Sequence, residues 1–191
     1  MILIFEGIDG SGKTTQIKLL SRELRKRKIK YYLTKEPKEP LRSVILKNKF
    51  HPLVYFFLFN ADRARNFLQI KKYLKKKYWI LIDRSFPSTF AYQWALGRLD
   101  KVIDKKLLLK ITKISTFSLY PDKVFVFDLP AEIAYSRLKK ENIFEDKGLN
   151  YFKKLRKVYL KLSKIFKWHV IDSSKSKKEV FEEIKKILKL C

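Results

Sequence analysis

The sequence predicts an α/β fold: a doubly wound, five-stranded parallel sheet flanked by helices. Three observations support this class: five short apolar runs, helical patterns between them, and a glycine-rich loop directly after the first run. Continuous apolar runs are typical of buried parallel strands, and their alternation with helices is typical of doubly wound sheets, which bind ligands at the carboxyl ends of their strands. The strands are expected at residues 2–5, 31–34, 79–82, 124–128 and 169–171.

Helices are predicted where apolar residues recur every three or four positions. The stretch 52–77 has room for one helix or two, and the polar residues 139–148 are expected to form a loop between two helices. The last helix begins with a capping box formed by Ser176 and Glu179. One stripe carries a single charged residue among apolar ones: Leu149, Phe152, Arg156, Tyr159, Leu162 and Phe166.

Length and composition bound the class of protein. The 191 residues are expected to form one domain spanning 1–191, and 46% hydrophobic residues suffice for a substantial core. No apolar run is long enough to span a bilayer, and the amino end carries a strand and a loop rather than a signal peptide. Cys191 is the one cysteine, so no internal disulfide can form. We therefore expect a cytoplasmic protein with no membrane partner.

The net charge of +26 has two explanations: a nucleic-acid-binding surface, or lysine-rich polar faces on helices, as in proteins from hot environments. The basic residues recur in short runs at 22–30, 71–77, 153–157 and 175–178 rather than in one block. Solvated helix faces are therefore favoured and no specific nucleic-acid partner is expected, although a positive field attracts anionic nucleotides.

The most specific motif lies in the first fifteen residues. G-x-x-x-x-G-K-T begins at Gly7, between an apolar strand and a helical pattern, which is the setting of a phosphate-binding loop. Lys13 is expected to reach the β- and γ-phosphates of ATP, and the Thr14 hydroxyl to bind Mg²⁺. The alternative is a glycine-rich turn before an ordinary helix. The predicted ATP-binding residues are Gly7, Ile8, Asp9, Gly10, Ser11, Gly12, Lys13, Thr14 and Thr15.

Two charged residues, Asp83 and Arg84, follow the third predicted strand. A strand-end aspartate near a phosphate-binding loop typically serves the Mg²⁺, directly or through water, and an arginine beside it offers a planar fork for phosphate. The alternative is an ordinary surface ion pair between the two. The nearby loop favours the functional explanation.

Several motifs resemble those of the thymidylate kinase family. Residues 83–93, D-R-S-F-P-S-T-F-A-Y-Q, are similar to the family's D-R-[aromatic]-x-x-S-x-x-A-Y-Q signature. F-E-G-I-D-G at 5–10 is similar to its phosphate loop, and L-F-N-A-D-R at 58–63 to its base-binding helix. T-K-E-P at 34–37 resembles its T-R-E-P turn, and V-I-D at 170–172 its final strand and adenine-side loop. The resemblance covers nearly the whole chain in the same order.

This resemblance implies an enzyme that phosphorylates dTMP to dTDP with ATP and Mg²⁺, and that forms a homodimer. In such an enzyme Phe59 stacks on thymine, Arg63 bonds its polar edge, and Gln93 bonds the base or a neighbouring side chain. The alternative for Phe59 is core packing. The dTMP-binding residues implied are Asp9, Lys35, Phe59, Arg63, Arg84, Ser88, Tyr92 and Gln93.

The sugar and phosphate contacts are implied in the same way. Asp9 accepts from the 3′-hydroxyl, Tyr92 crowds the 2′ position, and Arg84 holds the monophosphate, whereas Ser88 supports its helix. The alternatives are an Asx turn for Asp9 and a half-buried helix aromatic for Tyr92.

Catalysis should need no protein base, because a monophosphate with a second pKa of about 6 is mostly dianionic at neutral pH. Lys13, Asp83 and Arg84 are expected to position the reactants and neutralise charge, together with a lid at about 139–148.

The source of the lid's positive charge is open. One subclass of the family has an arginine where this chain has Gly10, so the resemblance is to the subclass with an arginine in the lid. Ile143 occupies that position here. The candidates to replace the arginine are Arg137, Lys139 and Lys140.

Other departures bear on specificity. Lys35 replaces an arginine, Lys38 and Glu39 replace a glycine pair, and Ser85 replaces an aromatic residue. Because missing contacts lower discrimination, we expect relaxed acceptor specificity. The competing interpretations are another nucleoside monophosphate or deoxynucleoside kinase, and a basic nucleic-acid-binding NTPase.

Overall fold

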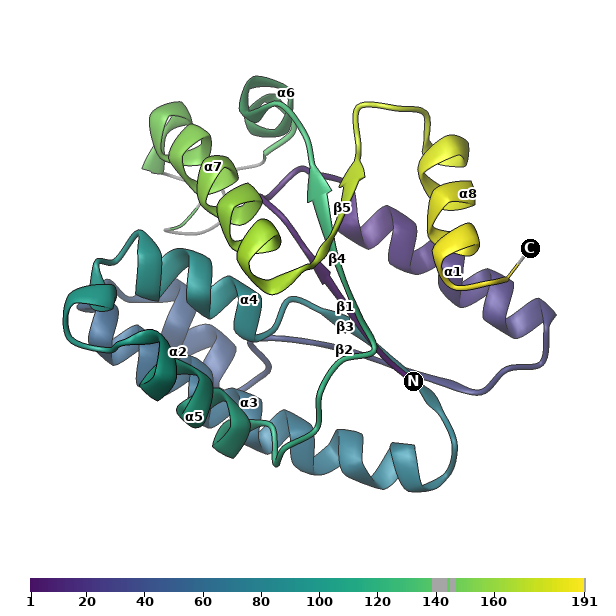
Figure 1. Ribbon diagram of the computed structural model, residues 1–191, viewed down its shortest axis with the longest axis horizontal. Coiled ribbons are helices and arrows are strands. Elements are labelled where there is room, and N and C mark those ends of the chain that lie inside the picture. Colours follow the sequence, from purple (N-terminus) through teal and green to yellow (C-terminus); the bar gives the residue numbers. More distant parts are fainter. Residues whose placement is uncertain (139–143, 145–146, 191) are drawn as a thin grey trace.

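A computed structural model describes residues 1–138, 144 and 147–190 of the chain. Five parallel strands form one sheet in the order β2-β3-β1-β4-β5 (Figure 1). This confirms the predicted fold class, and each predicted strand is present but one residue longer. The strands are β1 (Ile2–Glu6), β2 (Tyr31–Lys35), β3 (Trp79–Asp83), β4 (Lys123–Asp128) and β5 (His169–Asp172).

The sheet register places several charged residues at one edge. Phe5 of β1 pairs with Asp83 of β3, which in turn pairs with Lys35 of β2. On the other side, Asp128 of β4 pairs with Asp172 of β5. The connection that leaves β1 runs across the sheet toward β2, whereas the connections that leave β3 and β4 run in the opposite direction. The switch point of the sheet therefore lies beside β1, where such folds bind ligands.

Helices cover both faces of the sheet (Figure 1). One face packs against α1 (Lys13–Lys26) and α8 (Lys177–Ile187), whose apolar residues form a core with β1, β4 and β5. The predicted capping box at the start of α8 is present. None of the helices in the described ranges is long and apolar enough to cross a membrane.

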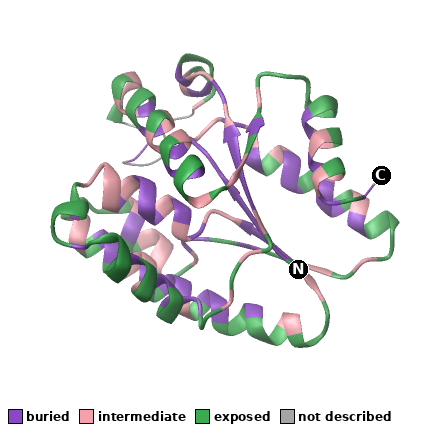
Figure 2. Cartoon of the chain, viewed as in Figure 1, coloured by how far each residue is buried: buried purple, intermediate pink, exposed green. Residues whose placement is uncertain are grey.

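The opposite face carries the larger core. Figure 2 shows the central strands as mostly buried, between helices that are largely exposed on their outer sides. Helix α3 (Pro52–Lys75) is continuous across the predicted stretch. A π-helical turn, η1, directly continues α4. The remaining elements are α2 (Leu41–Lys47), α3 (Pro52–Lys75), α4 (Phe86–Thr89), η1 (Phe90–Ala95), a 3₁₀ turn η2 (Leu99–Lys101), α5 (Lys105–Ser115), α6 (Ala131–Ser136) and α7 (Leu149–Phe166).

The buried stripe of α7 differs from the predicted one. Leu155, rather than Arg156, occupies the turn between Phe152 and Tyr159 and is fully buried. Arg156 lies at the edge of the stripe, where its Nε and Nη2 donate to the two carboxylate oxygens of Asp128 at 2.6 and 2.9 Å. The prediction was wrong because residues 155 and 156 both satisfy three-and-four spacing, and burial selects the apolar one.

These neighbours should therefore differ in their contribution to stability. Leu155→Ala should lower the free energy of unfolding by about 2–5 kcal/mol, because it leaves a cavity in the core. Arg156→Ala should cost about 1 kcal/mol, because its ion pair is partly exposed. Urea denaturation of both variants measures the difference, and a larger loss for Arg156→Ala would contradict this assignment.

Candidate active site

The phosphate-binding loop joins β1 to α1, as predicted. Gly10 has φ +81°, and a Cβ at this position would lie 2.3 Å from the backbone oxygen of Ala134 in α6. A side chain is therefore excluded by both conformation and packing. This contact explains why the loop carries no arginine at Gly10: the backbone of α6 occupies the space.

Lys13 arches back across the loop. Its Nζ donates to the carbonyl oxygens of Gly7 at 3.1 Å and Ile8 at 2.9 Å, and the residue is 6% exposed. Burial, reinforced by the charge of Arg84, lowers the pKa of Lys13 to about 8. The nearby carboxylates of Asp9, Asp83 and Glu6 partly offset this effect. Phosphate oxygens would offset it further by giving the buried ammonium an anionic partner.

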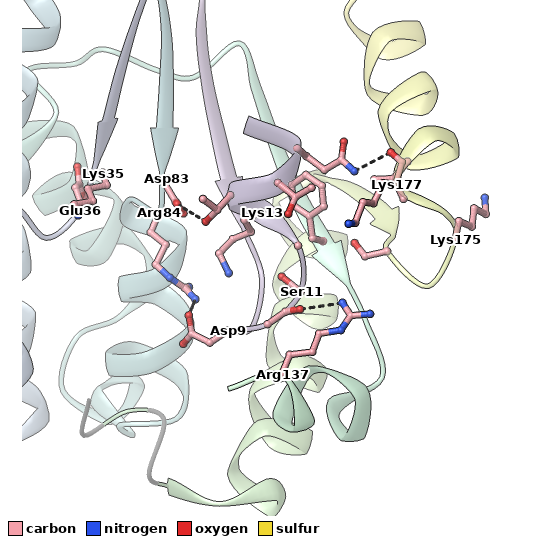
Figure 3. Close-up of a pocket in the computed structure, with 18 of the residues that line it drawn as sticks. Asp9, Ser11, Lys13, Lys35, Glu36, Asp83, Arg84, Arg137, Lys175 and Lys177 are labelled. Atoms are coloured by element: carbon pink, nitrogen blue, oxygen red, sulfur yellow. Dashed lines mark hydrogen bonds and ion pairs between the residues drawn. The ribbon is translucent and has the colours of Figure 1, made fainter. Parts of the chain in front are cut away.

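The loop opens into a cavity of about 870 Å³ at the carboxyl end of the sheet (Figure 3). Seven of the predicted ATP-binding residues line it, from Asp9 to Thr15. Gly7 and Ile8 instead hold Lys13 through their carbonyl groups. On the far side the cavity is lined by Ser173, Lys175, Lys177 and Val180, which follow β5 where the adenine-side loop was expected.

Thr14 and Asp83 meet at the predicted metal position. The Thr14 hydroxyl donates to Oδ2 of Asp83 at 3.2 Å, because β1 and β3 are neighbours in the sheet. No group of three or more His, Cys, Asp and Glu side chains in the described part of the chain could hold a metal alone. A hydroxyl and one carboxylate fit Mg²⁺, which is commonly bound by one or two carboxylates plus substrate phosphates.

Arg84 and Asp83 diverge despite being adjacent, so they do not form the surface ion pair considered above. Arg84 instead donates to Oδ1 of Asp9 at 2.5 Å, Ser88 Oγ at 3.2 Å and the Tyr159 hydroxyl at 3.3 Å. Burial disfavours the charge of Asp9, but Arg84, Lys13 and the Tyr92 hydroxyl together outweigh burial and lower the pKa of this carboxyl. The site therefore holds a fixed cation beside the loop.

Glu6 organises this cation and was missed by the sequence analysis. It is fully buried and accepts hydrogen bonds from the Ser85 backbone at 2.7 Å, Ser88 Oγ at 2.7 Å and the Tyr159 hydroxyl at 3.0 Å. Burial raises the pKa of Glu6, against the opposing charge of Arg84. Its signal was an acidic residue ending an otherwise apolar strand, which is unusual for a buried position.

A second, smaller cavity of about 150 Å³ adjoins the first. Its lining includes six of the predicted dTMP-binding residues, brought together from the phosphate-binding loop, the turn after β3, α3, α4 and η1. They are Asp9, Phe59, Arg84, Ser88, Tyr92 and Gln93. The Tyr92 hydroxyl lies 3.4 Å from Oδ2 of Asp9, at the opening between the cavities. Ser88 bonds Glu6 and Arg84, consistent with the supporting role implied for it.

Two predicted residues lie outside this pocket. Lys35 is exposed at the end of β2 and lines the larger cavity instead. Arg63 is 1% exposed, and its guanidinium donates to Glu36 at 3.1 Å, Asn60 at 3.0 Å and Thr89 at 2.8 Å. In this structure Arg63 therefore meets the pocket only through Glu36 and Thr89, which both line it.

Among the lining residues that were not predicted, Arg42 and Glu36 stand out because each lines both cavities, as do Asp9 and Arg84. Burial raises the pKa of Glu36 to about 7, and Arg63 opposes the shift. Glu36 belongs to the T-K-E-P turn, so its motif was noticed although its role was not; Arg42 stands on α2, where nothing in the sequence marked it.

Arg137 is the described candidate for the missing arginine. It follows α6, lines the larger cavity, and donates from Nη1 to the Gly10 carbonyl at 3.3 Å (Figure 3). Arg137 and Arg84 therefore approach the loop from different elements. Lys139, Lys140 and Ile143 lie outside the described residues, whereas Phe144 of the same predicted lid is described.

A phosphate-binding loop at a sheet switch point, a strand-end aspartate beside its threonine, and a second basic pocket define a P-loop phosphotransferase. The family model described as thymidylate kinase matches residues 5–184. The chain belongs to the thymidylate kinase family.

Relatives match along nearly their whole length. Thymidylate kinase of Thermosipho africanus is 37% identical over 98% of this chain and 97% of its own. Probable thymidylate kinase 1 of Saccharolobus solfataricus is 36% identical over 98% and 96%. Probable thymidylate kinase of Methanocaldococcus jannaschii is 37% identical over 96% and 93%.

The raised pKa of Glu36 predicts a pH effect on stability. The folded protein binds a proton that the unfolded chain releases above its ordinary pKa of 4.5, so stability should fall as pH rises from about 4.5 to about 7. Glu36→Gln should weaken this pH dependence, whereas Glu182→Gln, at an exposed position, should not. Denaturant titrations at pH 5 and 7.5 give the change in the free energy of unfolding between the two pH values. An equal change in wild type and Glu36→Gln would contradict the prediction.

Proposed function

We propose that this chain transfers the γ-phosphoryl group of ATP to dTMP, giving dTDP and ADP. The observation that carries the proposal is the pair of adjoining cavities. One is lined by the phosphate-binding loop and the other by aromatic and polar side chains, and both are lined by Asp9, Glu36, Arg42 and Arg84. Donor and acceptor phosphates would therefore meet beside two arginines.

On the donor side, Lys13 moves from the loop carbonyls to the β- and γ-phosphates, and Arg137 adds a second positive charge near Gly10. Thr14 and Asp83 would hold Mg²⁺ against the nucleotide. When bound, that ion neutralises charge that develops on the phosphates. Arg137 thus takes the role that other members give to an arginine in the lid.

On the acceptor side, Arg84 and Arg42 hold the monophosphate, Asp9 accepts from the 3′-hydroxyl, and Phe59 packs on the base. One oxygen of the dianionic monophosphate forms a bond to the γ-phosphorus while the bond from that phosphorus to the ADP oxygen breaks. No proton has to be removed from the acceptor, so positioning and charge neutralisation are the protein's contribution.

The first experiment is a coupled kinase assay against a panel of monophosphates. We expect turnover with dTMP, and relaxed specificity because Ser85 places a hydroxyl, bonded to Glu36, where an aromatic ring is usual. kcat/KM is compared for dTMP, dUMP, dCMP and dGMP. A preference for dTMP above about a thousandfold would end the idea of relaxed specificity, and no turnover with dTMP would end the proposed function.

Two substitutions separate the donor and acceptor halves. Lys13→Ala should reduce kcat by at least about a hundredfold with the fold intact, because γ-phosphate charge goes uncompensated. Arg84→Ala should chiefly raise KM for dTMP. Steady-state kinetics with each substrate varied in turn check both. Lys13→Ala activity within about tenfold of wild type, or a change in the ATP KM alone for Arg84→Ala, would show these assignments to be wrong.

The alternative of a basic nucleic-acid-binding NTPase makes a different prediction. Such a protein would hydrolyse ATP faster with DNA or RNA and show no response to dTMP, and its binding would weaken steeply with salt. Measuring ATP hydrolysis with each addition distinguishes the two.

We also propose a cytoplasmic location, as the composition predicts.

A homodimer is supported by an apolar stripe on the outer face of α3. Val54, Phe57 and Leu68 share this face and are 43–58% exposed. An exposed apolar stripe on a helix favours burial against a partner, and a second copy presents the same stripe. Sedimentation of wild type and Phe57→Glu tests this: a wild-type monomer would contradict it.

A further inference from the structure

We propose that Phe144 determines acceptor specificity: its ring is the wall that makes the smaller cavity fit a single-ring base better than a two-ring base. The inference rests on the proposed function, since it assigns the base to this cavity. It goes beyond that function by giving a base-selecting role to a residue of the predicted lid, a segment otherwise expected to serve the donor nucleotide.

Phe144 is firmly packed. It is 8% exposed and forms a core cluster with Ile45 of α2 and Tyr55 of α3. Its ring centroid lies 5.3 Å from that of Tyr55 and 5.7 Å from that of Tyr92, with the Tyr92 ring nearly perpendicular at 87°. Edge-to-face packing at these distances is the preferred aromatic arrangement. The Nζ atom of Lys147 lies over the Phe144 ring, 5.2 Å from its centroid.

The same ring lines the acceptor cavity, together with Phe59, Tyr92 and Gln93. The volume of about 150 Å³ is well below the range of about 300–1,000 Å³ in which proteins enclose larger ligands. The sugar and phosphate can extend toward the larger cavity past Asp9 and Arg84, which line both. The smaller cavity then has to hold only the base.

The other walls are set by regular structure. Phe59 belongs to α3, and Tyr92 and Gln93 belong to η1, where Gln93 is 3% exposed. Thr89 of α4 is fixed by its bond from Arg63. Phe144 instead lies between α6 and α7 in the chain, and it belongs to the small cluster with Ile45 and Tyr55 rather than to the main core of the sheet.

Removing the ring should therefore widen the cavity for a purine. A pyrimidine fits beside Phe144, whereas the second ring of a purine needs volume that Phe144 occupies. In wild type we expect dGMP to be a poorer ligand than dTMP. In Phe144→Ala the ratio of the dissociation constants, Kd for dGMP over Kd for dTMP, should fall at least about tenfold.

Phe50→Ala is the matched control. Phe50 packs edge-on against Tyr55 in the same aromatic cluster, at 5.5 Å, but does not line the cavity. Its replacement removes a ring of the same size from the cluster and should leave the ratio within about twofold of wild type. Phe144→Leu, which keeps an apolar side chain, should shift the ratio in the same direction by a smaller amount.

Isothermal titration calorimetry with dTMP and dGMP measures these ratios without requiring turnover, so a failure of the kinase proposal remains distinguishable. A lowered ratio in Phe144→Ala and an unchanged one in Phe50→Ala support the inference. An unchanged ratio in Phe144→Ala, or an equal fall in Phe50→Ala, overturns it. If Phe144→Ala does not fold, the same comparison is made with Phe144→Leu, and an unchanged ratio there overturns it.

Discussion

The structure of the site depends on one buried carboxylate, Glu6. It ends β1 and accepts donors from the loop after β3 and from α7, so three elements meet on its two oxygens. A buried carboxylate is stable only when its hydrogen-bonding capacity is filled, so the surrounding donors are held in fixed positions. Arg84 lies 3.8 Å from the same carboxylate, and two of the carboxylate's donors, Ser88 and Tyr159, also accept hydrogen bonds from Arg84. Glu6 therefore positions Arg84 and the residues around it, while its own oxygens are already hydrogen-bonded within the protein.

The site also concentrates positive charge where nucleotides would supply the negative charge. Lys13, Arg84, Arg137 and Arg42 all line the larger cavity. Burial, reinforced by the charge of Arg84, lowers the pKa of Lys13 to about 8. Phosphate groups would supply negative charge close to these side chains and would so favour the charged form of Lys13.

Packing also explains why the phosphate-binding loop of this chain carries no arginine at Gly10. Gly10 cannot carry a side chain because the backbone of α6 lies against it, and Arg137, just after α6, bonds the Gly10 carbonyl. The backbone of α6 therefore excludes an arginine side chain at Gly10, and Arg137, just after α6, places its guanidinium beside the loop instead. Phe144, which follows α6 in the chain, lines the smaller cavity, where we propose that the base of the acceptor binds.

The sequence by itself determined the sheet, the phosphate-binding loop and the meeting of Thr14 with Asp83. Strand patterning and strand-end motifs are local, and parallel strands bring their ends to one edge. Only the tertiary structure decided which side chains face the pocket. It placed Arg63 behind Glu36 and Thr89, moved Lys35 to the larger cavity, buried Leu155 in place of Arg156, and added Glu6 and Arg42. These outcomes depend on burial and on partners distant in the chain, for which residue spacing carries no signal.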